Sequence, residues 1–232
     1  MDINGLQKLT LLDYPGKTAC TVFLAGCNMK CPFCHNSELI TGNAPVEMTD
    51  EDLLKFLNKR SGLLDGVAFT GGEPLLRKEL PELFRKIKKL GYGIKLDTNG
   101  TSPKTMKTLI DEKLVDYIAM DIKNSPKLYS ETAGFSEFSN IDNILESINT
   151  LINSETEYEF RTTVVDQLHS EESFKDIGPM IKGAKRYFLQ PFVDRDSVAF
   201  SGFSAPSKEK LSLYKKLVEP YVKNVEIRGI SE

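Results

Sequence analysis

The sequence predicts an α/β fold, an incomplete open (β/α)6 TIM-like barrel with a parallel sheet and helices outside. Short β-type apolar runs alternate with amphipathic helical patterns along the 232-residue chain. This alternation is typical of parallel strands joined by helices. About six strand–helix units fit the length, whereas a closed eight-unit barrel typically needs about 250 residues. Because ligands bind at the carboxyl ends of the strands in such folds, functional residues are expected just after strands.

The first half of the chain carries clear helix boundary signals. Thr49 precedes the acidic residues 50–52 and an apolar stripe, which is the pattern of a helix N-cap. Pro81 and Gly91 mark the start and end of a second helix. Ser102 caps a third helix that runs to about residue 113. The strands predicted in this half are 18–24, 66–70, 93–97 and 115–121.

The same alternation continues to the C-terminus. Ser170 is expected to cap a helix over 171–182, and Ser207 begins a last helix that runs to about residue 222. Residues 141–152 form another amphipathic pattern. The strands predicted here are 158–165, 186–190 and a short final one at 225–227.

Composition excludes several classes of protein. Apolar residues make up 40% and charged residues 27% of the chain, and the net charge is −3. This is an ordinary globular balance, without the basic excess that attracts nucleic acid or anionic membranes. No run approaches the roughly 18 apolar residues of a membrane span, and residues 1–5 show no secretory signal. We expect a cytoplasmic protein with one domain over 1–232 and a core over about 18–227, acting on neither nucleic acid nor membrane.

Three of the four cysteines lie in one predicted loop, residues 25–41. Cys27, Cys31 and Cys34 form a C-x3-C-x2-C pattern. Since disulfides are rare in the cytoplasm, this spacing indicates a metal or iron–sulfur site. Cys20 lies within a predicted strand, where it is expected to be a small buried apolar residue. Three thiolates without a fourth would leave one metal position open for a substrate or cofactor.

Two other interpretations of the cysteines stay open at this point. A zinc site would need a fourth ligand from His35 or His169, and would make the protein a zinc-binding interaction module. A simple electron-transfer ferredoxin normally uses four cysteines for each cluster, and Cys20 is the one remaining candidate.

The cysteine pattern, with Phe33 as its aromatic residue, resembles the signature of the radical S-adenosylmethionine (radical SAM) superfamily. The resemblance implies that Cys27, Cys31 and Cys34 hold one [4Fe–4S] cluster. It also implies that S-adenosylmethionine chelates the fourth iron through its amino and carboxylate groups. Phe33 is then expected to pack near the adenine.

Gly71, Gly72 and Glu73 follow the second predicted strand and resemble the glycine-rich motif of the same superfamily. In the family this motif receives the methionine ammonium. Two glycines allow the backbone to approach closely without a Cβ clash, and a carboxylate can accept from an ammonium group. The resemblance therefore implies that these residues bind the cofactor.

The ends of the third and fourth predicted strands resemble the branch of the superfamily that activates glycyl radical enzymes. The resemblance implies that Asp97 and Asn99 belong to the polar floor of the cofactor site. It implies contacts of Asp121 with the ribose and of Lys123 with the methionine carboxylate. Whether Asp97 and Asp121 also bind a monovalent cation is left open.

The roles of Arg161 and of the segment after the sixth strand have more than one interpretation. Arg161 resembles another cofactor contact, because an inward arginine on a barrel strand needs an anion, but a structural ion pair would explain it equally well. Relatives often carry a ribose-contacting histidine after the sixth strand, where this chain has Phe192 and Val193. The ribose contact at that position is therefore unassigned.

Residues 11–17, 23–27 and 34–36 resemble the anaerobic ribonucleotide-reductase-activating type. The resemblance implies an oxidoreductase that cleaves S-adenosylmethionine reductively to a 5′-deoxyadenosyl radical. The radical then generates a glycyl radical on a partner enzyme, here anaerobic ribonucleotide reductase, and flavodoxin or ferredoxin supplies the electron. A radical SAM enzyme acting on a small molecule or peptide remains the alternative.

Overall fold

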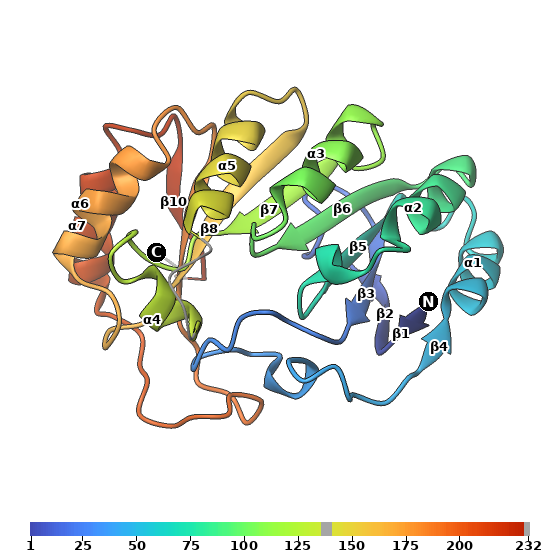
Figure 1. Cartoon of the computed structure of the whole chain (residues 1–232), viewed down its shortest axis with the longest axis horizontal. Coiled ribbons are helices and arrows are strands. Elements are labelled where there is room, and N and C mark those ends of the chain that lie inside the picture. The colour runs from blue at the N-terminus through green and yellow to red at the C-terminus, as the bar shows by residue number, and fades with distance from the viewer. Residues whose placement is uncertain (136–140, 230–232) are drawn as a thin grey trace.

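A computed structural model of the chain describes residues 1–135 and 141–229 (Figure 1). Its main element is an eight-stranded sheet in the order β10-β9-β8-β7-β6-β5-β3-β2. Neighbouring strands are parallel except for β2, which is antiparallel to β3. The strands are β2 (Gly5–Thr10), β3 (Ala19–Leu24), β5 (Gly66–Gly71), β6 (Gly93–Thr98), β7 (Tyr117–Asp121), β8 (Glu157–Val164), β9 (Tyr187–Pro191) and β10 (Val225–Ile227).

All helices but the short α4 (Tyr129–Ala133) lie on the outer side of the curved sheet, and β2 and β10 form its two free ends (Figure 1). α4 instead contacts the cysteine loop, where the backbone N–H of Lys30 donates to the Ala133 carbonyl. This arrangement confirms the predicted open barrel with helices outside. Among the described residues, no helix is long and apolar enough to cross a bilayer. The helices are α1 (Asp50–Lys59), α2 (Leu80–Lys89), α3 (Pro103–Asp111), α4 (Tyr129–Ala133), α5 (Ile141–Ile152), α6 (Glu171–Met180) and α7 (Lys208–Val218), with 3-10 turns η1 (Ser37–Leu39) and η2 (Pro74–Leu76).

Side-chain caps begin several helices where the sequence predicts them. The Thr49 side chain accepts from the backbone N–H of Asp52, and Ser170 accepts from that of Ser173, each within a capping box. Ser207 caps α7 through the backbone N–H of Lys210. These bonds satisfy backbone donors that a helix start otherwise leaves unpaired. Most other boundaries differ from the predicted ones by one to four residues, which is usual for helix and strand ends.

The N-terminal region differs from the prediction. β2 is an extra strand at the sheet edge, and β1 (Asp2–Ile3) pairs with β4 (Met48–Thr49) in a separate two-stranded sheet. Most side chains of β2 are exposed or half-buried. An edge strand therefore lacks the buried apolar pattern by which the inner strands are recognised.

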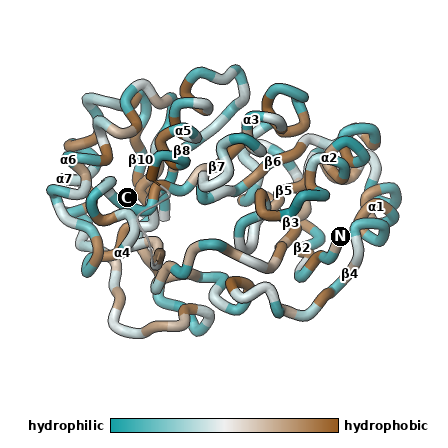
Figure 2. The backbone as a smooth tube through the Cα atoms, in the orientation of Figure 1, coloured by the Kyte–Doolittle hydropathy of each residue, from teal (hydrophilic) through white to brown (hydrophobic). Residues whose placement is uncertain are grey.

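The inner strands place charged residues inside the barrel. On β6, Ile94 and Leu96 are fully buried in the apolar core, to which Ile87 of α2 also belongs. Because side chains alternate along a strand, Lys95 and Asp97 point to the opposite, inner face. Figure 2 shows apolar colour concentrated along the strands, whereas the helices alternate between polar and apolar colour. The concave face of the sheet is thus available for a polar site.

Candidate active site

A cavity of about 190 Å³ lies at the carboxyl ends of the strands, between them and the cysteine loop. The sequence predicts the functional residues at these strand ends. The loop supplies Cys27, Met29, Cys31, Phe33, Cys34, His35, Asn36 and Ile40 to its wall. The strand ends supply Thr70, Gly71, Gly72, Asp97, Thr98, Asn99, Asp121, Lys123, Arg161 and Thr163. Every predicted site residue except Glu73 therefore lines one cavity.

The three clustered cysteines are free thiols on the cavity wall. Burial raises the pKa of Cys31 to about 11 and also raises the pKa of Cys27. The positive charge of Lys123 acts in the opposite direction on the pKa of both thiols. Since a thiol must lose its proton to bind a metal, a nearby ammonium group favours ligation.

Cys20 differs from the other three cysteines. It is fully buried in the apolar core, and burial raises its pKa to about 12. It does not line the cavity. The prediction that Cys20 is a small buried apolar residue is confirmed. The cysteines that line the cavity are Cys27, Cys31 and Cys34.

The donor set fits an iron–sulfur cluster. Among the described residues, no group of three or more His, Cys, Asp or Glu side chains is close enough together to hold a single metal ion. Cys27, Cys31 and Cys34 instead lie along one cavity wall. In a [4Fe–4S] cluster each thiolate binds a different iron, so three thiols ligate three corners and leave one iron without a protein ligand.

Gly71 and Gly72 bring the end of β5 against the base of the cysteine loop. The backbone N–H of Gly72 donates to the carbonyl of Leu24 at 2.8 Å, and that of Glu73 donates to the carbonyl of Gly26 at 2.8 Å. A Cβ at Gly71 would lie 2.5 Å from the Leu24 carbonyl oxygen, and one at Gly72 would clash with that of Gly26. The glycines therefore permit close approach to the cysteine loop, in addition to the predicted approach to a cofactor.

Glu73 is buried beneath this turn, with 1% of its surface exposed. Its carboxylate accepts from the backbone N–H of Leu75 at 3.0 Å, from that of Asn99 at 2.6 Å and from the Thr98 hydroxyl at 2.8 Å. Burial raises its pKa to about 7, although the hydrogen bonds act in the opposite direction. The carboxylate thus joins the ends of β5 and β6, and a contact with a methionine ammonium would require these bonds to rearrange.

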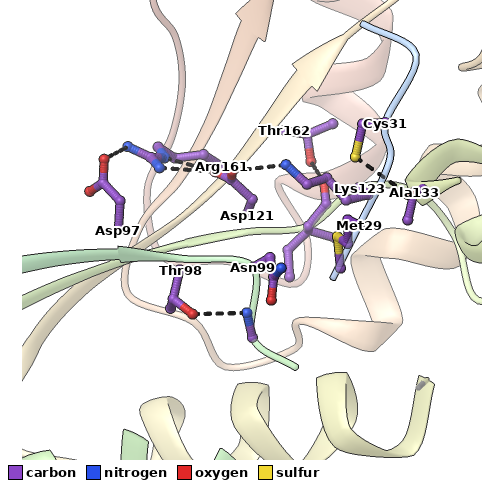
Figure 3. A network of polar contacts seen from close by, with 12 residues as sticks. Met29, Cys31, Asp97, Thr98, Asn99, Asp121, Lys123, Ala133, Arg161 and Thr162 are labelled. Atoms are coloured by element: carbon purple, nitrogen blue, oxygen red, sulfur yellow. Dashed lines mark hydrogen bonds and ion pairs between the residues drawn. The ribbon is translucent and has the colours of Figure 1, made fainter. Parts of the chain in front are cut away.

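An ion-pair network forms the floor of the cavity (Figure 3). The Arg161 guanidinium donates to Asp121 at 3.0 Å and to Asp97 at 3.4 Å. Lys123 donates to the other oxygen of Asp121 at 2.9 Å, and Lys95 is paired with Asp97. Although burial alone would raise them, these cations hold the pKa values of both aspartates below their usual range. Arg161 is therefore an ion-pair partner that also lines the cavity, and its contact with a cofactor stays a prediction.

A set of amide contacts, which the sequence did not predict, connects the cysteine loop to the end of β6. The Asn99 side chain donates to the Asn28 side-chain oxygen at 2.9 Å and lies 3.9 Å from the Cys27 sulfur. Asn28 in turn donates to the Thr101 hydroxyl at 2.8 Å. The loop is thereby attached beside the first cysteine.

His35 also lines the cavity, although the sequence predicts no cofactor contact for it. Its ring stacks on Phe192, with the centroids 5.4 Å apart, and its Nε2 lies 2.7 Å from the Val193 carbonyl oxygen. Phe192 and Val193 are the residues at which the resemblance left the ribose contact unassigned. The position of His35 directly after Cys34 was a signal available in the sequence.

The open barrel and the three-thiol cavity define an α/β protein with a candidate iron–sulfur site at the carboxyl edge of a parallel sheet. Residues 21–176 match the sequence profile of the Radical SAM superfamily. A protein of Methanocaldococcus jannaschii described as a glycyl-radical enzyme activating enzyme is 34% identical over 234 residues, covering 99% of this chain and 96% of that protein. The chain belongs to the radical SAM superfamily, in its branch of glycyl-radical enzyme activating enzymes.

One further relative and one solved structure are also similar to this chain. The pyruvate formate-lyase 1-activating enzyme of Escherichia coli is 28% identical over 247 aligned residues, covering 94% of this chain and 95% of that enzyme. The crystal structure of a radical SAM methyltransferase from Sphaerobacter thermophilus matches with a TM-score of 0.74 and 17% identity. That match covers 95% of this chain and 68% of the methyltransferase, and it supports the fold alone.

Proposed function

We propose that this protein generates a glycyl radical on a partner enzyme in the cytoplasm, and that the partner is anaerobic ribonucleotide reductase. The observation that carries the proposal is a single cavity lined by three free thiols and by the Asp97–Arg161–Asp121 network. The relatives in the activating branch support the reaction class. Residues 11–17, which resemble the ribonucleotide-reductase-activating type, support the choice of partner.

Cys27, Cys31 and Cys34 would hold the [4Fe–4S] cluster. Asp121, Lys123 and the neighbouring wall residues would hold S-adenosylmethionine beside it. When bound, the cluster and the cofactor supply one-electron reductive cleavage to methionine and a 5′-deoxyadenosyl radical, which abstracts the glycine α-hydrogen. An external flavodoxin or ferredoxin would supply the electron.

The residues of this chain orient the cofactors and exclude water. Lys123 places its ammonium near two of the thiols, where its charge favours their ionised form. Phe33 is 4% exposed and Met29 is 2% exposed, and both present apolar surface to the cavity. A dry, apolar wall would remove other hydrogen donors from the reach of a radical.

The unclosed sheet offers a route for the partner glycine. β2 and β10 are its two ends, and no strand of the described chain joins them. A protein loop is larger than a small substrate, so an opening of this kind suits a macromolecular substrate better than a closed barrel would.

Anaerobic reconstitution with iron and sulfide tests the reaction class. The reduced protein with S-adenosylmethionine should bind about four irons for each chain and release 5′-deoxyadenosine. Cys31→Ala should abolish both, whereas Cys20→Ala, the matched control at a core position, should retain both. Release of 5′-deoxyadenosine by Cys31→Ala at the wild-type rate would contradict the proposal.

A second assay tests the partner. The reduced protein is mixed without oxygen with anaerobic ribonucleotide reductase or with pyruvate formate-lyase, and electron paramagnetic resonance detects the glycyl radical. We expect the signal with the reductase. A signal with the lyase alone would retain the reaction class and reject the proposed partner.

A further inference from the structure

All four carboxylate oxygens of Asp97 and Asp121 have a nitrogen cation as partner. Asp97 Oδ1 is paired with Lys95 Nζ, and Asp97 Oδ2 lies 3.4 Å from Arg161 Nη1. Asp121 Oδ1 lies 3.0 Å from the Arg161 guanidinium, and Asp121 Oδ2 lies 2.9 Å from Lys123 Nζ. A metal ion bound by these two carboxylates would therefore have to share each oxygen with an ammonium or guanidinium group, or displace that group.

Lys95 is the member of this network that lies deepest in the protein. It is 3% exposed, and its side chain points to the inner face of β6, one inward position below Asp97. Lys95 does not line the cavity, so it would act on a ligand there only through its ion pair with Asp97. A buried ammonium group is costly unless an anion accompanies it, which makes the Lys95–Asp97 pair a persistent feature of the floor.

The charge of the network also disfavours a metal cation. Lys95, Arg161 and Lys123 face the carboxylates of Asp97 and Asp121, which leaves a surplus of one positive charge. An additional cation would increase this surplus beside partly buried charges, where electrostatic repulsion is stronger than in bulk water. The surplus instead suits an anionic group, such as the carboxylate of an amino acid. These residues therefore do not fit the monovalent cation that the resemblance left open.

We propose that the Lys95 ammonium takes the place of a monovalent metal cation beside Asp97, so that this protein binds S-adenosylmethionine without sodium or potassium. The inference rests on the proposed use of this cofactor. It adds a positioning role for Lys95, which acts through Asp97 and contacts no cavity ligand itself.

The first test measures the affinity of the anaerobically reconstituted wild-type protein for S-adenosylmethionine by isothermal titration calorimetry. Buffers containing choline, sodium or potassium chloride are compared at equal ionic strength. We expect dissociation constants within about twofold of one another, since ionic strength and hence screening are the same. A gain of about tenfold on adding sodium or potassium would overturn the inference.

The second test uses Lys95→Met, which keeps an unbranched apolar stem and removes the charge. In choline its affinity for S-adenosylmethionine should fall by about tenfold or more, because Asp97 loses a buried partner. Potassium or sodium should restore the affinity by filling the vacated position. Lys107→Met is the matched control, because Lys107 pairs with Asp111 on the exposed face of α3, far from the site. Unchanged affinity in choline, or a loss that no cation restores, would overturn the inference.

A third readout does not depend on the cofactor. Thallium(I) is a heavy monovalent cation, so crystals of the protein soaked in it report monovalent-cation sites by anomalous scattering. We expect no peak beside Asp97 in the wild-type protein and a peak there in Lys95→Met, at the position that the Lys95 ammonium group has vacated. A wild-type peak at this position would reject the inference even if S-adenosylmethionine bound as proposed. Failure of S-adenosylmethionine to bind in any buffer would reject the proposed function instead, and the thallium result would still decide the role of Lys95.

Discussion

The Asn99 side chain donates a hydrogen bond to the side-chain oxygen of Asn28 at 2.9 Å, across 71 positions in sequence. This bond joins the end of β6 to the cysteine loop immediately after Cys27. Asn99 also donates its backbone N–H to the buried carboxylate of Glu73 at 2.6 Å. One strand end therefore holds both the loop that carries the thiols and the carboxylate beneath the glycine turn.

Asn28→Ala should loosen the cysteine loop without unfolding the protein. The substitution removes the bonds to Asn99 and Thr101, and we expect the free energy of unfolding to fall by about 2 kcal/mol, the usual net value of two such bonds. Reconstituted protein should also lose iron to a chelator faster than the wild type, measured by the decay of cluster absorbance. Asn153→Ala is the control, because Asn153 is exposed and bonds within its own helix end. Equal rates of iron loss for all three proteins would show that the bond does not hold the loop.

Arg161→Lys should destabilise the protein more than an equivalent change at the surface. Arg161 bridges Asp97 and Asp121 with a side chain that is 16% exposed, and a lysine cannot reach both carboxylates with one forked group. We expect a loss of about 3 kcal/mol in the free energy of unfolding, as for a broken buried ion pair. Urea denaturation provides the measurement.

Arg85→Lys is the matched control for Arg161→Lys. Arg85 also bridges two carboxylates, Glu82 and Glu112, but it does so on the protein surface. Exposed pairs contribute little to stability, so this variant should denature close to the wild type. Similar losses at Arg161 and Arg85 would refute the special role of the buried bridge.

Glu73→Gln should change how stability depends on pH. Burial raises the pKa of Glu73 from 4.5 to about 7, so between these pH values the folded state holds a proton that the unfolded state has released. The free energy of unfolding should therefore fall as pH rises through this window, by up to about 1.4 kcal/mol for each pH unit. In Glu73→Gln this contribution disappears, because glutamine does not titrate. The free energies of unfolding of this variant and the wild type should therefore differ least near pH 4.5 and most near pH 7.

Urea denaturation between pH 4.5 and 7.5 checks this prediction. Glu155→Gln serves as the control, because Glu155 is exposed in the segment after α5. It should follow the wild-type curve throughout. Parallel curves for wild type and Glu73→Gln would show that Glu73 is ionised in the folded protein across the whole range.

The sequence predicts those parts of the site that depend on local spacing. Cys27, Cys31 and Cys34 lie within one loop, so their proximity follows from the chain itself, and their position after a strand follows from the alternation of elements. The helix caps at Thr49 and Ser170 are predicted for the same reason, since a cap bonds backbone groups only three residues away.

The remaining features depend on packing between distant segments. Glu73 was expected to face the cofactor, but three donors from η2 and the end of β6 hold its carboxylate in the interior. Lys95 and Asp97 lie two residues apart on β6, but the burial of Lys95 depends on its position in the middle of the sheet, where β5 and β7 flank β6. The strand β2 was missed because an edge strand with exposed side chains has no apolar pattern.

The contact between His35 and Phe192 leads to a last prediction. The two rings stack at 5.4 Å, and His35 Nε2 lies 2.7 Å from the Val193 carbonyl oxygen. This contact holds the end of the cysteine loop against the segment that follows β9. Because His35 also lines the cavity, loss of the contact should open the cofactor site without removing a cluster ligand.

A double-mutant cycle measures this coupling. His35→Ala and Phe192→Ala should each weaken S-adenosylmethionine binding while iron content stays at the wild-type level. If the rings act as a pair, the double variant should bind more tightly than the sum of the two losses predicts, with a coupling of about 1 kcal/mol, as for other aromatic pairs. Phe200→Ala is the control, since Phe200 is 61% exposed in the same segment. Additive losses would mean that His35 and Phe192 contact the cofactor independently, and loss of iron in His35→Ala would mean that the stacked ring supports the cluster itself.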